Sequence, residues 1–119
     1  PGTCNSNNVL RMFSDVRATI KSNIDALTAT GATSGHIGLA WAWYMLSPNW
    51  ETLFAGGTNA AGPYGDDDFV KVAVMMTDGE FNTAYCTGVV DSTINCNATN
   101  GGPYPQFAAL CAGMKGDGI

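Results

Sequence analysis

The feature that most constrains this fold is an apolar run that stops abruptly at an acidic residue. Residues 72–77 are all apolar or β-branched, and Asp78, Gly79 and Glu80 follow them directly. This length and composition are typical of a strand buried on both faces of a parallel sheet. We therefore expect Asp78 at the carboxyl end of a strand, the edge where open α/β sheets bind ligands. The alternative is that Asp78-Gly79 only turns the chain, since this dipeptide is a frequent turn former.

The length of the chain suits one domain. Its 119 residues, 45% of them hydrophobic, can build a single globular core. We expect residues 1–119 to form one partial domain of a longer protein, because the sequence starts without methionine and stops within a pattern. No stretch approaches the roughly 20 consecutive apolar residues of a membrane span. The given residues are therefore not expected to span a membrane.

The charge distribution argues against nucleic acid as a partner. The net charge is −5, and the basic residues are scattered rather than clustered: Arg11, Arg17, Lys21, Lys71 and Lys115. Proteins that bind nucleic acid usually gather such residues into a patch.

The four cysteines, at positions 4, 86, 96 and 111, lack the close pairs of a zinc site. Their even number is compatible with disulfides in an oxidising compartment. A bridge between Cys86 and Cys96 is favoured, because both lie in one long polar loop. Cys111 fits a buried thiol equally well.

The order of the remaining segments predicts an α/β fold. Apolar residues recur at helical spacing over residues 9–27, residues 36–46 are apolar nearly all round, and residues 106–115 repeat the helical pattern. The buried strand lies between the second and third helices. Helices alternating with such a strand are typical of a parallel sheet.

A hydroxyl-rich loop, residues 28–35, precedes the second predicted helix. Thr33 or Ser34 can cap that helix, which is the simplest interpretation. Alternatively, a threonine hydroxyl from this loop helps to coordinate a hard cation. His36, the single histidine, has no serine, cysteine or acid at a catalytic spacing and is not expected to act as a base. The acidic run 66–68 is expected on a solvated rim rather than at a calcium ion.

Several of these segments together resemble a known family. Gly31-Ala32-Thr33 before the second helix, and Val74-Met75-Met76-Thr77-Asp78-Gly79-Glu80, are similar to the second and third motifs of the von Willebrand factor A domain. Within that family, the sequence of these motifs is most similar to that of the TadG-type tight-adherence (Flp) pilus-assembly proteins. The late residues 110–119 add to this resemblance, which covers about residues 14–119.

The resemblance implies a fold and a metal site. The fold would be the Rossmann-like von Willebrand A fold, with a parallel-rich central sheet flanked by helices and lacking its first and last strands. The site would be a metal-ion-dependent adhesion site, in which Thr33 and Asp78 hold Mg²⁺. The first motif of that site, Asp-x-Ser-x-Ser, is absent, because Asp15 has no such serines after it. Magnesium wants six oxygen ligands in near-octahedral geometry, so we expect weak or incomplete binding.

The resemblance also implies a function. Such a site binds rather than catalyses: a protein partner completes the coordination with a carboxylate, and no catalytic residue is expected. The loops at residues 49–68 and 82–105 would set specificity. The intact protein would act in pilus assembly in the periplasm or elsewhere outside the bacterial cytoplasm, anchored to the inner membrane only through a segment not present here. Two alternatives stay open, a metal-dependent hydrolase with Glu80 as base and a structural envelope module whose ion site has decayed.

Overall fold

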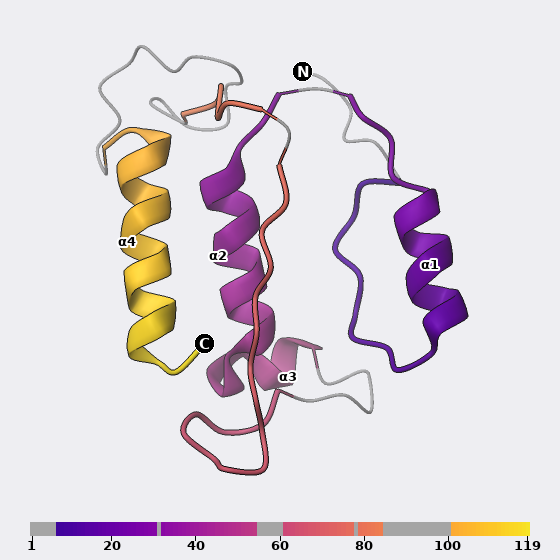
Figure 1. Ribbon diagram of the computed structural model, residues 1–119, viewed down its shortest axis with the longest axis vertical. Coiled ribbons are helices and arrows are strands. Elements are labelled where there is room, and N and C mark those ends of the chain that lie inside the picture. The colour runs from indigo at the N-terminus through magenta and orange to yellow at the C-terminus, as the bar shows by residue number, and fades with distance from the viewer. Residues whose placement is uncertain (1–6, 31, 55–60, 78, 85–100) are drawn as a thin grey trace.

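The computed structural model of the chain describes residues 7–30, 32–54, 61–77, 79–84 and 101–119 (Figure 1). These residues form four α-helices and one short 3-10 helix. In chain order they are α1 (Arg17–Asp25), α2 (Gly35–Leu46), η1 (Pro48–Trp50), α3 (Glu51–Phe54) and α4 (Pro103–Gly116).

The central helix, α2, matches the apolar run predicted at residues 36–46 and begins one residue earlier. Ser34 is its N-cap residue, one of the two predicted candidates, but the side chain makes no capping hydrogen bond. Ser47 ends the helix, and Pro48 opens η1. Proline cannot continue an α-helix, because it lacks the backbone N–H and its ring clashes with the preceding turn. Local sequence therefore accounts for the C-terminal end of α2.

The C-terminal helix, α4, is longer than the predicted range 106–115 because it begins at Pro103. Proline suits the first turn of a helix, where its missing N–H would have no partner in any case. After Gly116 the chain turns at Gly118, whose φ of +79° lies in the left-handed region that favours glycine. The N–H of Ile119 then donates to the carbonyl of Met114 at 2.9 Å, which closes the helix end.

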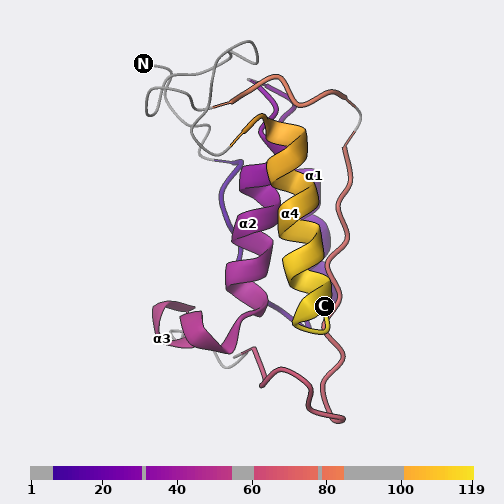
Figure 2. The same ribbon diagram turned by 90° about the vertical axis from the view of Figure 1, so that its left-hand side faces the viewer.

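The helices α2 and α4 lie side by side and run in the same direction (Figures 1 and 2). The indole Nε1 of Trp43 on α2 donates to Asp117 Oδ2 at the end of α4, over 3.2 Å. The same N–H lies 3.2 Å from the hydroxyl of Tyr64. Two neighbouring helices with the same direction need a connection that returns along them, and residues 69–77 supply it (Figure 1).

The buried core is small and is spread along this helix pair, from the upper end, where the chain from residue 79 to residue 84 crosses it (Figure 1), to Met114 near the C-terminal end of α4. The buried apolar side chains in the described part of the chain are Leu39, Phe81, Ala84 and Met114. Thr83 is buried with them. A core this small explains why many large apolar side chains stay exposed elsewhere on the described surface.

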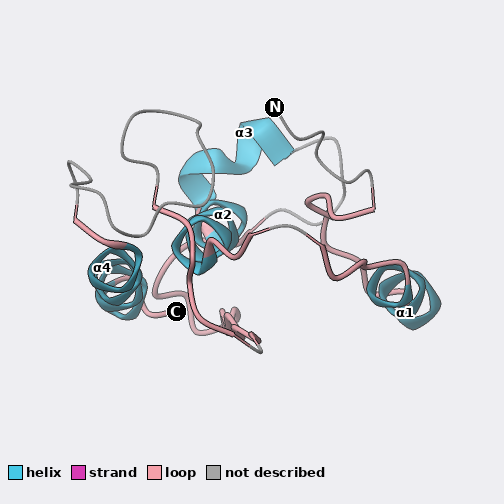
Figure 3. Cartoon of the chain, turned by 90° about the horizontal axis from the view of Figure 1, so that it is seen from above, coloured by secondary structure: helices cyan, strands magenta, loops and turns pink. Residues whose placement is uncertain are grey.

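The returning segment, residues 69–77, is extended but is not part of a sheet. Figure 3 shows helices and loops and no strand among the described residues. Val70 is 90% exposed, Val74 is 78% exposed and Met76 is 87% exposed. In the described part of the chain, none of the backbone groups of residues 70–76 bonds to another backbone group.

The predicted fold class is therefore wrong. The described residues are helical, without the parallel-rich central sheet of a Rossmann-like von Willebrand A fold. The apolar pattern at residues 72–77 does produce an extended backbone. A strand also needs a neighbouring strand to share its hydrogen bonds, and no described segment takes that place.

The first helix is shorter than predicted. The pattern at residues 9–27 predicts one long helix, whereas α1 begins only at Arg17. The Ser14 hydroxyl accepts a hydrogen bond from the N–H of Val16, 3.1 Å away, and such local bonds compete with helix formation. Helix α1 lies to one side of the α2–α4 pair and buries none of its residues (Figures 1 and 3).

The connection after α2 contains more structure than predicted. The sequence predicts an irregular surface loop over residues 49–68, but η1 and α3 occupy its first part. The Asp66 carboxylate accepts a hydrogen bond from the N–H of Asp68 at 2.9 Å, which makes a local turn.

Lys71 connects the returning segment to the end of α2. Its Nζ donates to the carbonyl of Leu46 at 2.7 Å and also to the carbonyl of Gly62. Lys71 thereby fastens the returning segment to the end of α2.

Candidate functional site

The two segments predicted to carry the metal site meet at the upper end of the molecule. The N–H of Thr33 donates to Asn82 Oδ1 at 2.5 Å, and the N–H of Asn82 donates to the carbonyl of Thr33 at 3.0 Å. This reciprocal pair joins residues 49 positions apart in the sequence. It fixes the hydroxyl-rich loop against the chain that follows Asp78. The Thr33 side chain is half-buried, and the pair uses only its backbone groups.

Phe81 holds this junction against both helices. Its ring stacks on Tyr104, with centroids 5.0 Å apart and planes 11° apart, and meets Phe107 at 5.3 Å. The N–H of Phe81 also donates to the Tyr104 hydroxyl at 3.0 Å. On the other side the ring covers Gly35, where a β-carbon would stand 2.1 Å from Phe81 Cε1. Only glycine fits at this first position of α2, so the close approach depends on the sequence at residue 35.

Asp78, the second predicted ligand, lies outside the described residues. The residues on either side of it are in contact, since Thr77 Oγ1 donates to the carbonyl of Gly79 at 3.2 Å. Glu80 follows with an exposed side chain. The structure therefore brings the Thr33 loop against residues 79–84 through Asn82.

The residues at this end fit a magnesium ion only in part. Hydroxyl and carboxylate oxygens are the donors that magnesium prefers. However, Asn82 Oδ1 already accepts hydrogen bonds from the Thr33 N–H and from the Thr83 hydroxyl, the latter over 3.3 Å. Across the described ranges no three His, Cys, Asp or Glu residues lie close enough together to hold a metal ion. The weak or incomplete magnesium site expected from the sequence stays a prediction.

Two buried polar atoms near the start of α2 have no hydrogen-bond partner among the described residues: Ser34 Oγ and His36 Nδ1. His36 is only 2% exposed. Burial lowers the pKa of its imidazole below the ordinary value of 6.5, since the charged form loses its hydration. His36 is therefore neutral at neutral pH. The interpretation that it does not act as a base stays a prediction.

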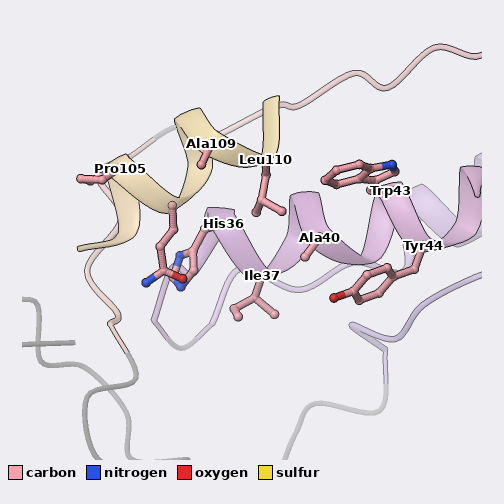
Figure 4. A pocket seen from close by; sticks show the side chains of 9 residues that line it. His36, Ile37, Ala40, Trp43, Tyr44, Pro105, Ala109 and Leu110 are labelled. Carbon is pink, nitrogen blue, oxygen red and sulfur yellow. The ribbon is translucent and has the colours of Figure 1, made fainter. Parts of the chain in front are cut away.

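A cavity of about 490 Å³ opens between α2 and α4. Figure 4 shows its lining: from α2 come His36, Ile37, Ala40, Trp43 and Tyr44, and from α4 come Pro105, Ala109 and Leu110, with Gln106 completing the set. Gln106 is held by its side-chain amide, which donates to the carbonyl of Gly101 at 2.6 Å. Most of these side chains are apolar, so the cavity offers few groups that could orient a polar ligand.

The remaining predicted features fall partly outside the described residues. Cys86 and Cys96, the favoured disulfide pair, are not among them. Cys111 is a free thiol on α4 and is half-buried rather than fully enclosed. Of the acidic run 66–68, Asp67 and Asp68 are exposed and Asp66 is half-buried. In the described part of the chain, no helix combines the length and apolar character needed to cross a bilayer.

Sequence reasoning missed Asn82, Phe81 and Tyr104. Asn82 is one of many polar residues in the predicted loop 82–105, so nothing in its local pattern distinguishes it. Phe81 gives a weak signal, because it is a large aromatic residue between Glu80 and Asn82. An aromatic side chain in a polar loop usually finds a core to cover.

Comparison with known proteins adds no assignment. No protein family, no curated protein and no solved structure matches this chain.

Proposed function

We propose that this chain is a binding domain that holds a protein partner through a divalent cation, Mg²⁺, at the end where the Thr33 loop meets the chain after Asp78. The reciprocal hydrogen bonds between Thr33 and Asn82 carry this proposal. They hold the Thr33 loop against the residues that follow Asp78, within the helical arrangement of the described residues.

The roles of the residues follow from their chemistry. Thr33 would contribute its hydroxyl and Asp78 its carboxylate, and when bound the ion would offer an open position to a carboxylate of the partner. Phe81, packed between Gly35 and Tyr104, keeps the junction rigid. The affinity for magnesium alone should be weak, because so few protein oxygens are available.

The setting of this function follows from the family resemblance. The motifs around Thr33 and Asp78 are similar to those of von Willebrand factor A domains in TadG-type pilus-assembly proteins. The proposal therefore includes a role in Flp pilus assembly at the bacterial envelope. The domain would lie on the periplasmic side, with its anchor in the inner membrane. Binding of nucleic acid and catalysis are not part of it.

A thermal-shift titration with magnesium, manganese and calcium tests the ion site. We expect the melting temperature to rise at millimolar magnesium, because an ion that binds only the folded state stabilises it. The rise should disappear in Asp78→Asn and in Thr33→Val. Two matched controls, Asp67→Asn on the acidic rim and Thr30→Val in the same loop, should keep it.

Two results would refute the proposal. One is the absence of any shift in the wild-type protein, which would favour a structural module with a decayed ion site. The other is a shift that persists in both Asp78→Asn and Thr33→Val, because the ion would then bind elsewhere.

A further inference from the structure

The returning segment, residues 70–76, has the properties of a β-strand without a partner. Its backbone is extended, and in the described part of the chain its N–H and C=O groups make no bond to other backbone groups. Open rows of such groups are a template for pairing with another strand. Seven residues also lie within the usual range of strand lengths, roughly 3–10 residues.

From Val70 to Val74 the side chains alternate between two environments. Val70, Val72 and Val74 are exposed, whereas Lys71 and Ala73 between them are half-buried; Met75 and Met76 are then both exposed. Alternation with a period of two is the geometry of a strand that has one face covered. The covered side faces the rest of the molecule, as the bonds from Lys71 to Leu46 and Gly62 show.

This segment lacks the sequence features by which exposed edge strands normally avoid pairing with other strands. It contains no proline and no acidic residue. Its one charged side chain, Lys71, is tied to its own chain by two carbonyls and lies 4.6 Å from the centroid of the Tyr64 ring. An exposed lysine would repel an approaching strand, but this one is held away from the open edge.

The sequence of the segment is nearly symmetric about Ala73. In an antiparallel pair of two copies centred on that residue, Val72 lies opposite Val74 of the second copy and Val70 lies opposite Met76. Exposed apolar residues thus meet at these positions, while the exposed Met75 lies opposite the half-buried Lys71. Cross-strand pairs of β-branched residues are favourable, by roughly 0.2–1 kcal/mol each. No like charges face each other in this register.

We infer that two copies of this chain associate through residues 70–76, which pair as antiparallel strands about a twofold axis at Ala73. This interface is isologous, since the same segment contributes both halves. It lies on the returning segment and does not involve the Thr33–Asn82 junction, so it is independent of the proposed ion site.

Analytical ultracentrifugation of the wild-type protein over a range of concentrations, in the presence of a chelator, tests this inference. We expect a reversible dimer, together with an infrared signal of antiparallel β-structure that grows as the dimer forms. The double variant Val72→Lys with Val74→Lys puts lysines opposite each other across the axis. It should weaken dimerisation by at least about tenfold, because like charges directly opposite destabilise a strand pair.

Two further variants distinguish strand pairing from nonspecific hydrophobic association. Val74→Pro removes one backbone donor that has no backbone partner in the described chain, so it should abolish the dimer while leaving the helical circular-dichroism signal unchanged. Leu53→Lys is the matched control on α3, since Leu53 is 63% exposed and Val72 is 65% exposed. It should leave the dimer intact.

The inference is overturned if the wild-type protein stays monomeric at the highest concentration. It is also overturned if the dimer survives in both the double-lysine and the proline variants. Loss of the dimer in Leu53→Lys would likewise exclude the strand interface.

Discussion

Gly113 of α4 lies directly against the indole of Trp43 of α2: a β-carbon at residue 113 would stand 2.4 Å from Trp43 Cη2. The two helices can approach this closely only because the side chain is missing. The contact also positions the indole N–H, which donates to Asp117. One glycine thus determines how α2 and α4 pack and how the end of α4 is held.

Gly113→Ala should destabilise the protein by about 1–3 kcal/mol, because the added methyl group forces the indole or the helix to move. Gly38→Ala on α2 is the control, since no atom lies within 4 Å of the position that a β-carbon would take there. Alanine favours a helix over glycine by about 1 kcal/mol, so this control should be neutral or stabilising. Urea unfolding of both variants measures the difference. Equal stability of the two would contradict the packing described for Trp43.

Asn82→Ala should lower the stability by about 0.5–1.5 kcal/mol, since the Thr33 N–H loses its acceptor. It should also weaken the magnesium-dependent rise in melting temperature, because the Thr33 loop is no longer held against residues 79–84. Asn82→Asp keeps a side-chain oxygen at the same place and is expected to retain most of the stability. Thermal denaturation with and without magnesium checks both effects. A magnesium response that is identical in Asn82→Ala and the wild type would contradict this role.

The stability should fall on acidification below about pH 6.5 because of His36. Burial lowers the pKa of this imidazole in the folded state, so between that lowered pKa and 6.5 the unfolded chain binds more protons than the folded one. The contribution is complete above pH 6.5 and is lost as the pH falls through the folded-state pKa. The measurement is the free energy of unfolding against pH for the wild type and for His36→Gln. The slope attributed to His36 should be missing in the variant, and an unchanged slope would assign it to other groups.

Lys71→Met should destabilise the protein by about 1–3 kcal/mol, because two carbonyls, of Leu46 and Gly62, lose a charged donor. Lys21→Met is the matched control. Lys21 pairs with Asp25 on the exposed side of α1, at 2.6 Å, with side chains 71% and 61% exposed. Exposed pairs of this kind contribute less than about 0.5 kcal/mol. Chemical denaturation measures the free energy of unfolding of both variants. A larger loss of stability in Lys21→Met than in Lys71→Met would contradict the role of Lys71 in holding the returning segment to the end of α2.

The helices show how far local sequence determines this fold. The bounds of α2 could be predicted to within one residue, because an apolar run is enclosed by Ser34 on one side and Ser47-Pro48 on the other. The prediction of a sheet from residues 72–77 is wrong. Their composition specifies an extended backbone with apolar side chains, but a strand forms only when a second segment supplies hydrogen bonds. That second condition depends on the whole fold.

The candidate site also combines a feature that local sequence indicates with a contact that it does not. The composition of the hydroxyl loop around Thr33, and its position before a helix, are enough to single it out. Its contact with Asn82 could not be predicted, because the two residues are 49 positions apart and neither side chain is unusual for its segment. Asp78 remains a prediction from the sequence, since it lies outside the described residues.

The parallel arrangement of α2 and α4 has a consequence for how the protein is made. The residues that join the two helices, Trp43 and Asp117, are 74 positions apart. A ribosome adds roughly 5–20 residues per second, so the apolar face of α2 emerges several seconds before α4 exists to cover it. Contacts between distant residues also form slowly once the chain is complete. During synthesis, Trp43 and its neighbours are therefore open to chaperones and to other nascent chains.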